Sequence, residues 1–537
     1  DFYGRYIQLF SEDKSIANLR YKKADAHFEN SQFDLAAQEY TLAAYGKHTN
    51  KTTNKAAYAS IVAFQKHIEV LTKEQASEEE MNKWHALSLE SMLKFSEIYH
   101  QDKRSISVLT NAAQAMFALK QFDRAIEVAS NLIEKTPKIN NKLKQTAYGI
   151  IAHCYFQKTE YSLAKTNYLL QRKITAKKSS EYSTISNQIA ASIYKTAENL
   201  KIEKLHQKAI TELLSIKKIA PKSTIRVLAQ YDAASLMLAE QNWDRAIKEL
   251  TLLKKNAPKH ELAKHFPRKL AFAYEKKQDW KKAATAYLQL SIHDVDGAIR
   301  QEALFIASGL FEKIGNDKKA IELYRDYAHK YEQPFDNRME ARFHLASLYE
   351  KQKDYTRQLF WLRRIVDGDK KAGDLATQRS HWLGAWANAK YGDYFAWEFS
   401  RRKLRMPIEQ RLLKKNGYLN DATQRYEMAA SYGILEFVSM SSFKIADMYE
   451  HFANELSNPP LPKGMAAQDV KVYKSILSEQ AQPMYAQASA VYQGNIDLSW
   501  QGHFNEWIDK SFMAMRRLQP VRYNKIEEVA RYGDEIR

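Results

Sequence analysis

A short pattern recurs along this chain and constrains its fold more than any other feature. Each copy has an aromatic residue, two further residues and an alanine, with a small residue twelve positions before that alanine. The copies place the small residue, the aromatic residue and the alanine at Ala24, Phe33 and Ala36; Ala113, Phe122 and Ala125; Ala152, Tyr161 and Ala164; Ala234, Trp243 and Ala246; and Ala271, Trp280 and Ala283. Successive turn positions are 39 residues apart from Phe122 to Tyr161 and 37 apart from Trp243 to Trp280. A period of this length predicts stacked helical hairpins.

Each copy is predicted to form two helices joined by a short turn. In residues 231–258, apolar side chains recur at helical spacing on both sides of the polar turn 240–242. Pro258 then ends the second helix, because proline cannot continue a helical hydrogen-bond ladder. We expect the two alanines of each copy to lie where only a methyl group fits between closely packed helices.

These residues resemble the tetratricopeptide repeat family, in which small residues let the hairpin close, a turn aromatic packs across it and a proline ends the second helix. Pro137 and Pro258 each lie twelve residues after their alanines, Ala125 and Ala246. The resemblance implies an all-α, right-handed superhelical solenoid of antiparallel helix pairs with helical caps.

Several copies depart from the pattern. Asp317 replaces the turn aromatic, and Gln358 stands where an alanine is due. The period continues to Tyr394, but Ala385 is followed by Trp397, so that hairpin is expected to open up. Residues 45–108 and 174–222 fit the register poorly. In them we predict an elongated hairpin of helices near 55–71 and 78–99, and a helix pair on either side of 201–204.

The repeat divides the chain into three predicted parts. Residues 1–20 are an N-terminal capping segment, and residues 21–445 are the helical repeats. A proline-rich stretch, 458–464, interrupts the pattern, because such a stretch is stiff and extended. Residues 446–537 are predicted to form a C-terminal helical capping module, which a solenoid needs to cover its last apolar face.

Composition narrows the cellular context. No run approaches 18 consecutive apolar residues, so we expect no transmembrane segment. The chain begins at Asp1 rather than Met, which fits either a removed export or lipoprotein leader or a trimmed chain. We expect a periplasmic protein, with the cytoplasm as the alternative. Cys154 is the single cysteine, which excludes internal disulfides, and a buried core position is expected for it rather than a nucleophilic one.

The chain carries a formal charge of +19, from 82 Lys and Arg against 63 Asp and Glu. Much of this excess is lysine spread over predicted helix surfaces, but a dense basic run covers 401–415 and is interrupted at Pro407. It directly follows the most aromatic stretch of the chain. Trp and Arg together dominate protein-binding hot spots. The predicted partner-binding residues are therefore Trp361, Arg363, Arg364, Trp382, Trp386, Trp397, Arg401, Arg402 and Arg405. Core filling by the tryptophans and a solvated helix end at the arginines are the structural alternatives.

Motifs that carry chemistry are missing from the sequence. There is no HExxH zinc pair, GxSxG nucleophile elbow, GxxxxGK phosphate loop or glycine-rich dinucleotide turn. We therefore predict no catalytic residue, no metal site and no cofactor. Basic charge alone permits nucleic-acid binding, but no recognition module is visible, so no specific nucleic-acid partner is predicted.

The degenerate repeats and the predicted tail resemble the large periplasmic tetratricopeptide proteins of proteobacterial envelope machines, including gliding-motility and TonB-associated complexes. This resemblance implies a non-enzymatic scaffold that holds a segment of a partner protein in a concave groove. One alternative is a binder of anionic envelope polymer, peptidoglycan or lipopolysaccharide, or the platform of a glycan-processing enzyme. Another is a cytosolic regulator or an RNA-associated repeat protein.

Overall fold

The structure is a computed structural model that describes residues 2–48, 51–135 and 139–525, with the backbone alone for Lys135. The chain divides into two compact units, Asp1–Ala273 and Tyr274–Arg537. Within the described residues, all regular structure is α-helix apart from two short 3₁₀ helices, Glu261–Lys264 and Gly373–Leu375. Pro137, which the family pattern includes, lies outside the described residues.

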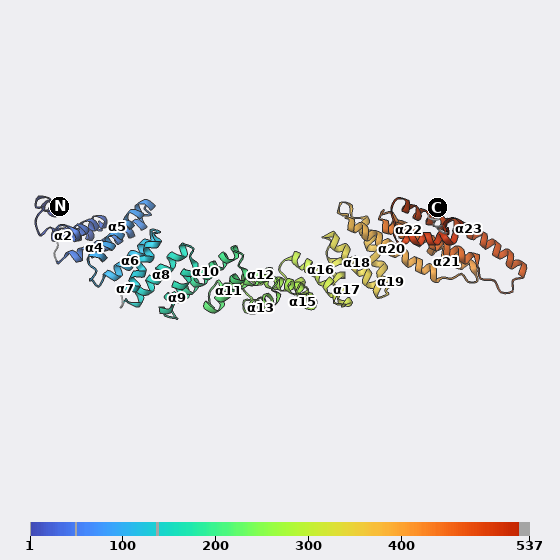
Figure 1. Cartoon of the computed structure of the whole chain (residues 1–537), viewed down its shortest axis with the longest axis horizontal. Helices are drawn as coiled ribbons and strands as arrows, with labels where there is room; N and C mark the ends of the chain where they lie inside the picture. Colours follow the sequence, from blue (N-terminus) through green and yellow to red (C-terminus); the bar gives the residue numbers. More distant parts are fainter. Residues whose placement is uncertain (1, 49–50, 136–138, 526–537) are drawn as a thin grey trace, which may run out of the picture. The chain divides into compact units, whose positions relative to one another are not determined.

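The first unit is a series of helical hairpins in chain order (Figure 1). A short helix, α1 (Phe2–Leu9), precedes them. The first helices of the hairpins are α2 (Ile16–Glu29), α4 (Thr53–Lys73), α6 (Ser105–Ala118), α8 (Asn141–Gln157), α10 (Ser180–Ile202) and α12 (Arg226–Ala239). Their second helices are α3 (Phe33–Tyr45), α5 (Glu78–Ile98), α7 (Phe122–Lys135), α9 (Tyr161–Ile174), α11 (His206–Ile219) and α13 (Trp243–Asn256).

The second unit continues the same pattern with longer helices toward its end. Helix α14 (His265–Lys276) crosses the division between the units. The helices after it are α15 (Trp280–His293), α16 (Gly297–Lys313), α17 (Asp317–Lys330), α18 (Phe335–Lys351), α19 (Tyr355–Lys370), α20 (Gln378–Arg401), α21 (Ile408–Ala430), α22 (Leu435–Ser457), α23 (Ala467–Trp500), α24 (Glu506–Leu518) and α25 (Pro520–Tyr523).

Packing within each unit is between neighbours in the chain, as expected for a solenoid. The first helices of successive hairpins also contact one another: α6 packs against α8, and α20 packs against both α18 and α22. Among the described residues, the second helices make no comparable contact with each other. We call the side of each unit on which these first helices contact one another the inner side. The predicted all-α solenoid of antiparallel helix pairs is confirmed, whereas its right-handed superhelical twist stays a prediction.

The small residues of the repeat are the points of closest helix packing. The ten residues that define the pattern are fully buried: Ala24, Ala36, Ala113, Ala125, Ala152, Ala164, Ala234, Ala246, Ala271 and Ala283. A larger side chain at such a position would overpack the hairpin, which typically costs about 1–3 kcal/mol.

The hairpin turns share a backbone conformation that the sequence pattern did not reveal. The residues with positive φ include Ser31, Lys120, Thr159, Gln241 and Gly315, each in a turn between two paired helices. The residue after each of them donates its N–H to the carbonyl five residues earlier; in one turn Asn242 bonds Met237 at 2.8 Å. This is the Schellman arrangement, which satisfies the last carbonyls of the first helix. Only one of these five residues is a glycine, so the residue types alone did not indicate a positive φ in these turns.

The sequence predicted a hairpin turn near Tyr394, and this prediction is wrong. Tyr394 and Trp397 lie inside α20, which runs without a break from Gln378 to Arg401, and the second helix of that hairpin is α21. Buried Ala385, Gly392 and Phe399, seven residues apart, lie along one face of this continuous helix across the expected turn. The predicted elongated hairpin is confirmed as α4 and α5, and the pair around 201–204 as α10 and α11.

The predicted limits between the N-terminal cap, the repeats and the C-terminal cap fall inside helices, and this division of the chain stays a prediction. Residues 1–20 contain α1 and the start of α2, and the limit at 445 falls inside α22. The proline-rich stretch 458–464 lies in the connection between α22 and α23.

Cys154 lies in the core of the first unit, as expected. Its side chain on α8 is fully buried, and burial raises the pKa of the thiol to about 11. We expect iodoacetamide to leave Cys154 unmodified in the folded protein and to alkylate it once urea unfolds the chain, because the thiolate is the reactive form. Mass spectrometry of the two samples gives the readout, and rapid alkylation of the folded protein would contradict the placement.

Candidate protein-interaction surface

Trp361 lies in the core of the second unit. Its side chain is 5% exposed, and its ring centroid lies 5.4 Å from that of His329 on α17. The neighbouring Leu362 and Ile365 on α19 are fully buried in the same cluster. The prediction of Trp361 as an accessible apolar anchor therefore needs correction, because its ring is already packed against α17.

Trp382 and Trp386 share one face of α20, as their spacing predicted, but both are partly buried. The Phe343 ring of α18 lies 4.7 Å from the Trp386 ring and 6.2 Å from the Trp382 ring. On the other side, the Phe437 ring of α22 lies 5.5 Å from Trp382. The two tryptophans thus join three successive first helices on the inner side of the unit. The guanidinium of Arg379, which the sequence reading missed, lies 4.5 Å above the Trp382 ring.

Trp397 belongs to an exposed group of aromatic side chains. Its ring lies 5.6 Å from the ring of Tyr355, at the start of α19, and 6.2 Å from that of Tyr394. The guanidinium of Arg401 stacks 4.5 Å above the Trp397 ring. Trp397 is 45% exposed and Tyr355 is 39% exposed. We call these four residues, Tyr355, Tyr394, Trp397 and Arg401, the turn patch.

The basic run beside the turn patch is only partly neutralised. Glu398, 5% exposed, pairs with Arg401 at 2.8 Å and also with Arg402. Arg402 is drawn inward, with its guanidinium 4.2 Å above the Tyr418 ring. Residues 398–405 contain four basic side chains and one carboxylate, which leaves a net charge of +3. Arg405 is exposed and forms no ion pair within the described part of the chain.

Arg363 and Arg364 form a separate group on the solvent face of α19. The Arg363 side chain is 76% exposed, with its Nε 3.9 Å from a carboxylate oxygen of Asp367. The Arg364 guanidinium lies 5.3 Å from the ring of Phe360, which is 45% exposed. The structure therefore divides the predicted arginines between this face and the basic run 401–405, of which Arg401 belongs to the turn patch.

The prediction that Lys415 belongs to a basic surface run is also wrong. Its side chain is fully buried, with Nζ 2.8 Å from a carboxylate oxygen of Glu455 and 4.3 Å from the centroid of the Phe399 ring. Burial lowers the pKa of Lys415, an effect that Glu455 partly offsets. Lys415 thus ties α21 to α22 and adds no surface charge.

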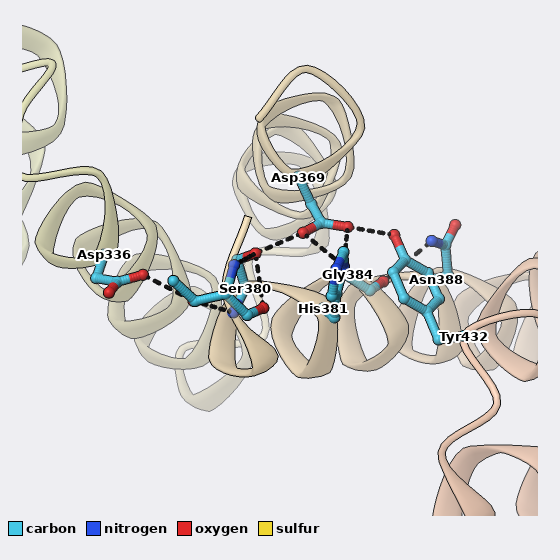
Figure 2. A network of polar contacts seen from close by, with 8 residues as sticks. Asp336, Asp369, Ser380, His381, Gly384, Asn388 and Tyr432 are labelled. Carbon is cyan, nitrogen blue, oxygen red and sulfur yellow. Dashed lines mark hydrogen bonds and ion pairs between the residues drawn. The ribbon is translucent and has the colours of Figure 1, made fainter. Parts of the chain in front are cut away.

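A buried carboxylate fixes the helices that carry the turn patch (Figure 2). Asp369, at the end of α19, accepts hydrogen bonds from the Ser380 hydroxyl at 2.7 Å and from the Tyr432 hydroxyl at 2.8 Å. Nδ1 of His381 lies 3.4 Å from the same carboxylate. Burial, together with the hydrogen bond to Asp369, raises the pKa of Tyr432 above its ordinary value. The contacts join the end of α19, the start of α20 and the loop after α21.

Two further features allow this network to form. Gly384 lets the helices approach closely, since a Cβ there would lie 2.4 Å from the Tyr432 hydroxyl oxygen. Thr377 caps α20 by accepting the N–H of Ser380 at 3.1 Å, and its hydroxyl donates to Asp336 of α18 at 2.9 Å. No spacing in the sequence indicated these residues as a group.

The Ser380, His381 and Asp369 side chains do not have the arrangement of a nucleophilic triad. Ser380 is fully buried, and its hydroxyl donates directly to Asp369 rather than to His381. A nucleophile needs an adjacent base and access to substrate. The network therefore positions helices, and the accessible chemistry of this region is the aromatic and cationic surface of the turn patch.

Two other findings concern the described residues as a whole. Their helices include none with the length and apolar character to cross a membrane. Nor do they bring three or more His, Cys, Asp or Glu side chains together in a way that could hold a metal ion.

Comparison with known proteins gives structural neighbours only. A scan against models of protein families gives no match, and a search of curated proteins gives none either. Similar solved structures include the C-terminal part of a TPR repeat-containing protein from Cytophaga hutchinsonii, with 16% identity, a TM-score of 0.25, and coverage of 50% of this chain and 97% of that one. A tetratricopeptide repeat protein from Parabacteroides merdae has 11% identity, a TM-score of 0.24, and coverage of 54% and 98%. The apo form of RapI has 14% identity, a TM-score of 0.21, and coverage of 89% and 99%.

At TM-scores this low, superposition of whole chains does not establish a common fold. The class of protein is instead defined by the helix pairs, their buried alanines and their packing between chain neighbours. The chain is an all-α helical-repeat solenoid, as the resemblance to the tetratricopeptide repeat family implied.

Proposed function

We propose that this chain is a non-enzymatic protein-interaction scaffold and that a segment of a partner protein docks on the turn patch. The observation that carries the proposal is the exposed contact of Trp397 with Tyr355 and Arg401. Large aromatic side chains and arginine are enriched at the centres of protein interfaces and supply most of their binding energy. Packing against the chain itself leaves much of the Trp397 ring exposed.

The chemistry of the patch favours a partner segment that combines an apolar side chain with acidic residues. The apolar group would cover the Trp397 ring. The acidic groups would face the net charge of +3 on residues 398–405, and this charge would also raise the association rate. The inner-side tryptophans, Trp382 and Trp386, are a less accessible second anchor, because Phe343 and Phe437 already contact them.

A bacterial envelope complex is the setting we propose for this scaffold, with the protein exported to the periplasm. The support is the resemblance to large periplasmic tetratricopeptide proteins and the basic surface. A binder of anionic envelope polymer is the alternative, and it predicts salt-sensitive binding to purified wall material or lipopolysaccharide without a protein partner.

Surface variants combined with crosslinking test this proposal. The native protein, Trp397→Ala, and a double variant with Arg401→Glu and Arg405→Glu would each be used as bait in extracts of the source cells. We expect one protein to crosslink reproducibly to the native bait, with its yield reduced at least about tenfold by either variant, since loss of a hot-spot contact costs 1.4 kcal/mol or more.

The matched control replaces Arg363 and Arg364 by Glu, which makes the same charge change on a different face of the unit. Capture should then stay near the native level. Equal capture by all baits would contradict the turn patch as the docking site. Recovery of wall polymer or nucleic acid without a reproducible protein would favour the alternative functions.

A further inference from the structure

A cavity in the first unit has the lining of an anion-binding site. It lies between the end of α9, the first half of α10 and the connection from α11 to α12, with a volume of about 390 Å³. We propose that this cavity binds a phosphate monoester carried on a compact organic group. Its charged lining residues are Arg172, Lys177 and Lys222. The inference does not rest on the proposed partner docking, which concerns the other unit.

Arg172 is held in place while part of its guanidinium stays available. Its Nη1 donates to the carbonyl oxygen of Ile219 at 2.8 Å and to the Ser186 hydroxyl at 3.3 Å, and its Cζ lies 5.6 Å from the Tyr182 ring centroid. A guanidinium has five N–H donors in a planar fork that matches phosphate oxygens. In the described structure, Nε and Nη2 of Arg172 donate no hydrogen bond, so these donors can bind an anion in the cavity.

The cavity has positive charge without a compensating carboxylate. None of its lining residues is Asp or Glu. Within the described part of the chain, Arg172, Lys177 and Lys222 form no ion pair, although other basic residues nearby do, such as Lys165 with Glu212 at 3.1 Å. Three cations around one cavity repel each other, and an anion between them would remove that repulsion. The lining therefore favours a ligand with more than one negative charge.

The remaining lining residues supply short polar side chains and an apolar wall, and the hydroxyls of Ser179 and Ser186 already donate to the carbonyl oxygens of Ala176 and Tyr182. The polar side chains are hydroxyls and an amide, from Ser179, Ser183, Ser186, Ser223 and Asn187. The wall is formed by the ring of Tyr182 together with Ile219, Ala220 and Pro221. A phosphate alone would leave this wall uncovered. A phosphorylated sugar or a group of similar size would place its phosphate at the cations and its body against the wall.

Calorimetric titration of the full chain tests the site, with inorganic phosphate, glucose 6-phosphate and glucose as probes at constant ionic strength. We expect glucose 6-phosphate to bind more tightly than inorganic phosphate, and glucose not to bind. The variant Lys177→Ala with Lys222→Ala should weaken glucose 6-phosphate binding at least about tenfold. Both lysines are exposed at the rim, so this variant is expected to melt at the native temperature.

The control variant replaces Lys254 and Lys255, exposed on α13, by Ala, which removes the same charge elsewhere on the unit. Native-like binding of glucose 6-phosphate by this control supports the site. Equal weakening of that binding by both variants would show only a general attraction to a basic surface and would overturn the proposal. Absence of heat with glucose 6-phosphate at millimolar concentration would also overturn it. If phosphatidic acid vesicles compete with glucose 6-phosphate, the source of the phosphate is a lipid headgroup; if they do not, it is a soluble ester.

Discussion

Replacing Glu455 by Ala is expected to lower the free energy of unfolding by about 3–5 kcal/mol at neutral pH, because it leaves Lys415 as a buried charge without a partner. Nζ of Lys415 is fully buried and lies 2.8 Å from the Glu455 carboxylate. Urea unfolding, followed by circular dichroism, measures the loss.

The loss should be smaller at alkaline pH. Burial already lowers the pKa of Lys415 in the folded protein, and removal of Glu455 lowers it further. The unfolded chain then binds the proton more tightly than the folded one, so stability rises with pH across the interval between the two pKa values. Urea unfolding of Glu455→Ala at pH 7 and pH 10 gives the comparison.

A double variant, Lys415→Met with Glu455→Leu, separates the buried charge from the loss of packing. Replacement of a whole buried ion pair by apolar side chains is often neutral or stabilising, so the double variant should recover most of the stability. The exposed pair of Glu506 and Lys510, with side chains 66% and 42% exposed, provides the control, because Glu506→Ala should leave stability nearly unchanged. If Glu455→Ala were as stable as the native protein, Lys415 would not be buried as described.

Replacing Trp361 by Ala should cost about 3–5 kcal/mol, the usual range for a large aromatic residue removed from a core. Trp361 is 5% exposed and packs among buried residues of α17 to α19. Trp397→Ala should change stability far less, because nearly half of that side chain is exposed. The two variants thus compare a core tryptophan with the exposed tryptophan that we propose to contact the partner; the sequence made both of them candidates for binding.

Thermal and urea unfolding of the two variants measure the difference, with partner capture as the second readout. Trp361→Ala should be less stable than the native protein. It should capture less of the partner protein only because part of the variant is unfolded, so partner capture should return at lower temperature. Trp397→Ala should lose capture at every temperature while it stays folded. Equal stability of Trp361→Ala and the native protein would contradict the core placement.

The helical hairpins were predictable because the repeat acts through local geometry. Small residues such as Ala246 and Ala283 must lie at the closest approach of two helices, and a fixed period places them there in successive copies. The turns were predictable in position but not in conformation. Non-glycine residues such as Gln241 take a positive φ there, because the Schellman hydrogen bonds to the preceding helix stabilise it.

The candidate site was predictable in region but not in detail. Aromatic and basic composition indicated residues 361–415, yet composition does not show which side chains face inward. Trp361 and Lys415 are buried because their positions on α19 and α21 face the helix layer, whereas Trp397 lies off the buried face of α20 that holds Ala385 and Phe399. Asp369, Ser380 and Tyr432 lie far apart in sequence, up to 63 residues, so only the fold brings them together.

Site-specific photocrosslinking would show whether a protein partner docks on the turn patch. A photoreactive benzophenone amino acid would replace Trp397 in the full chain in living source cells, and Ile202, 80% exposed in the first unit, would serve as the control position. We expect one defined crosslinked protein from position 397, absent from position 202 and lost when Arg401 is replaced by Glu. The same crosslinks from both positions, or none from position 397, would contradict this docking.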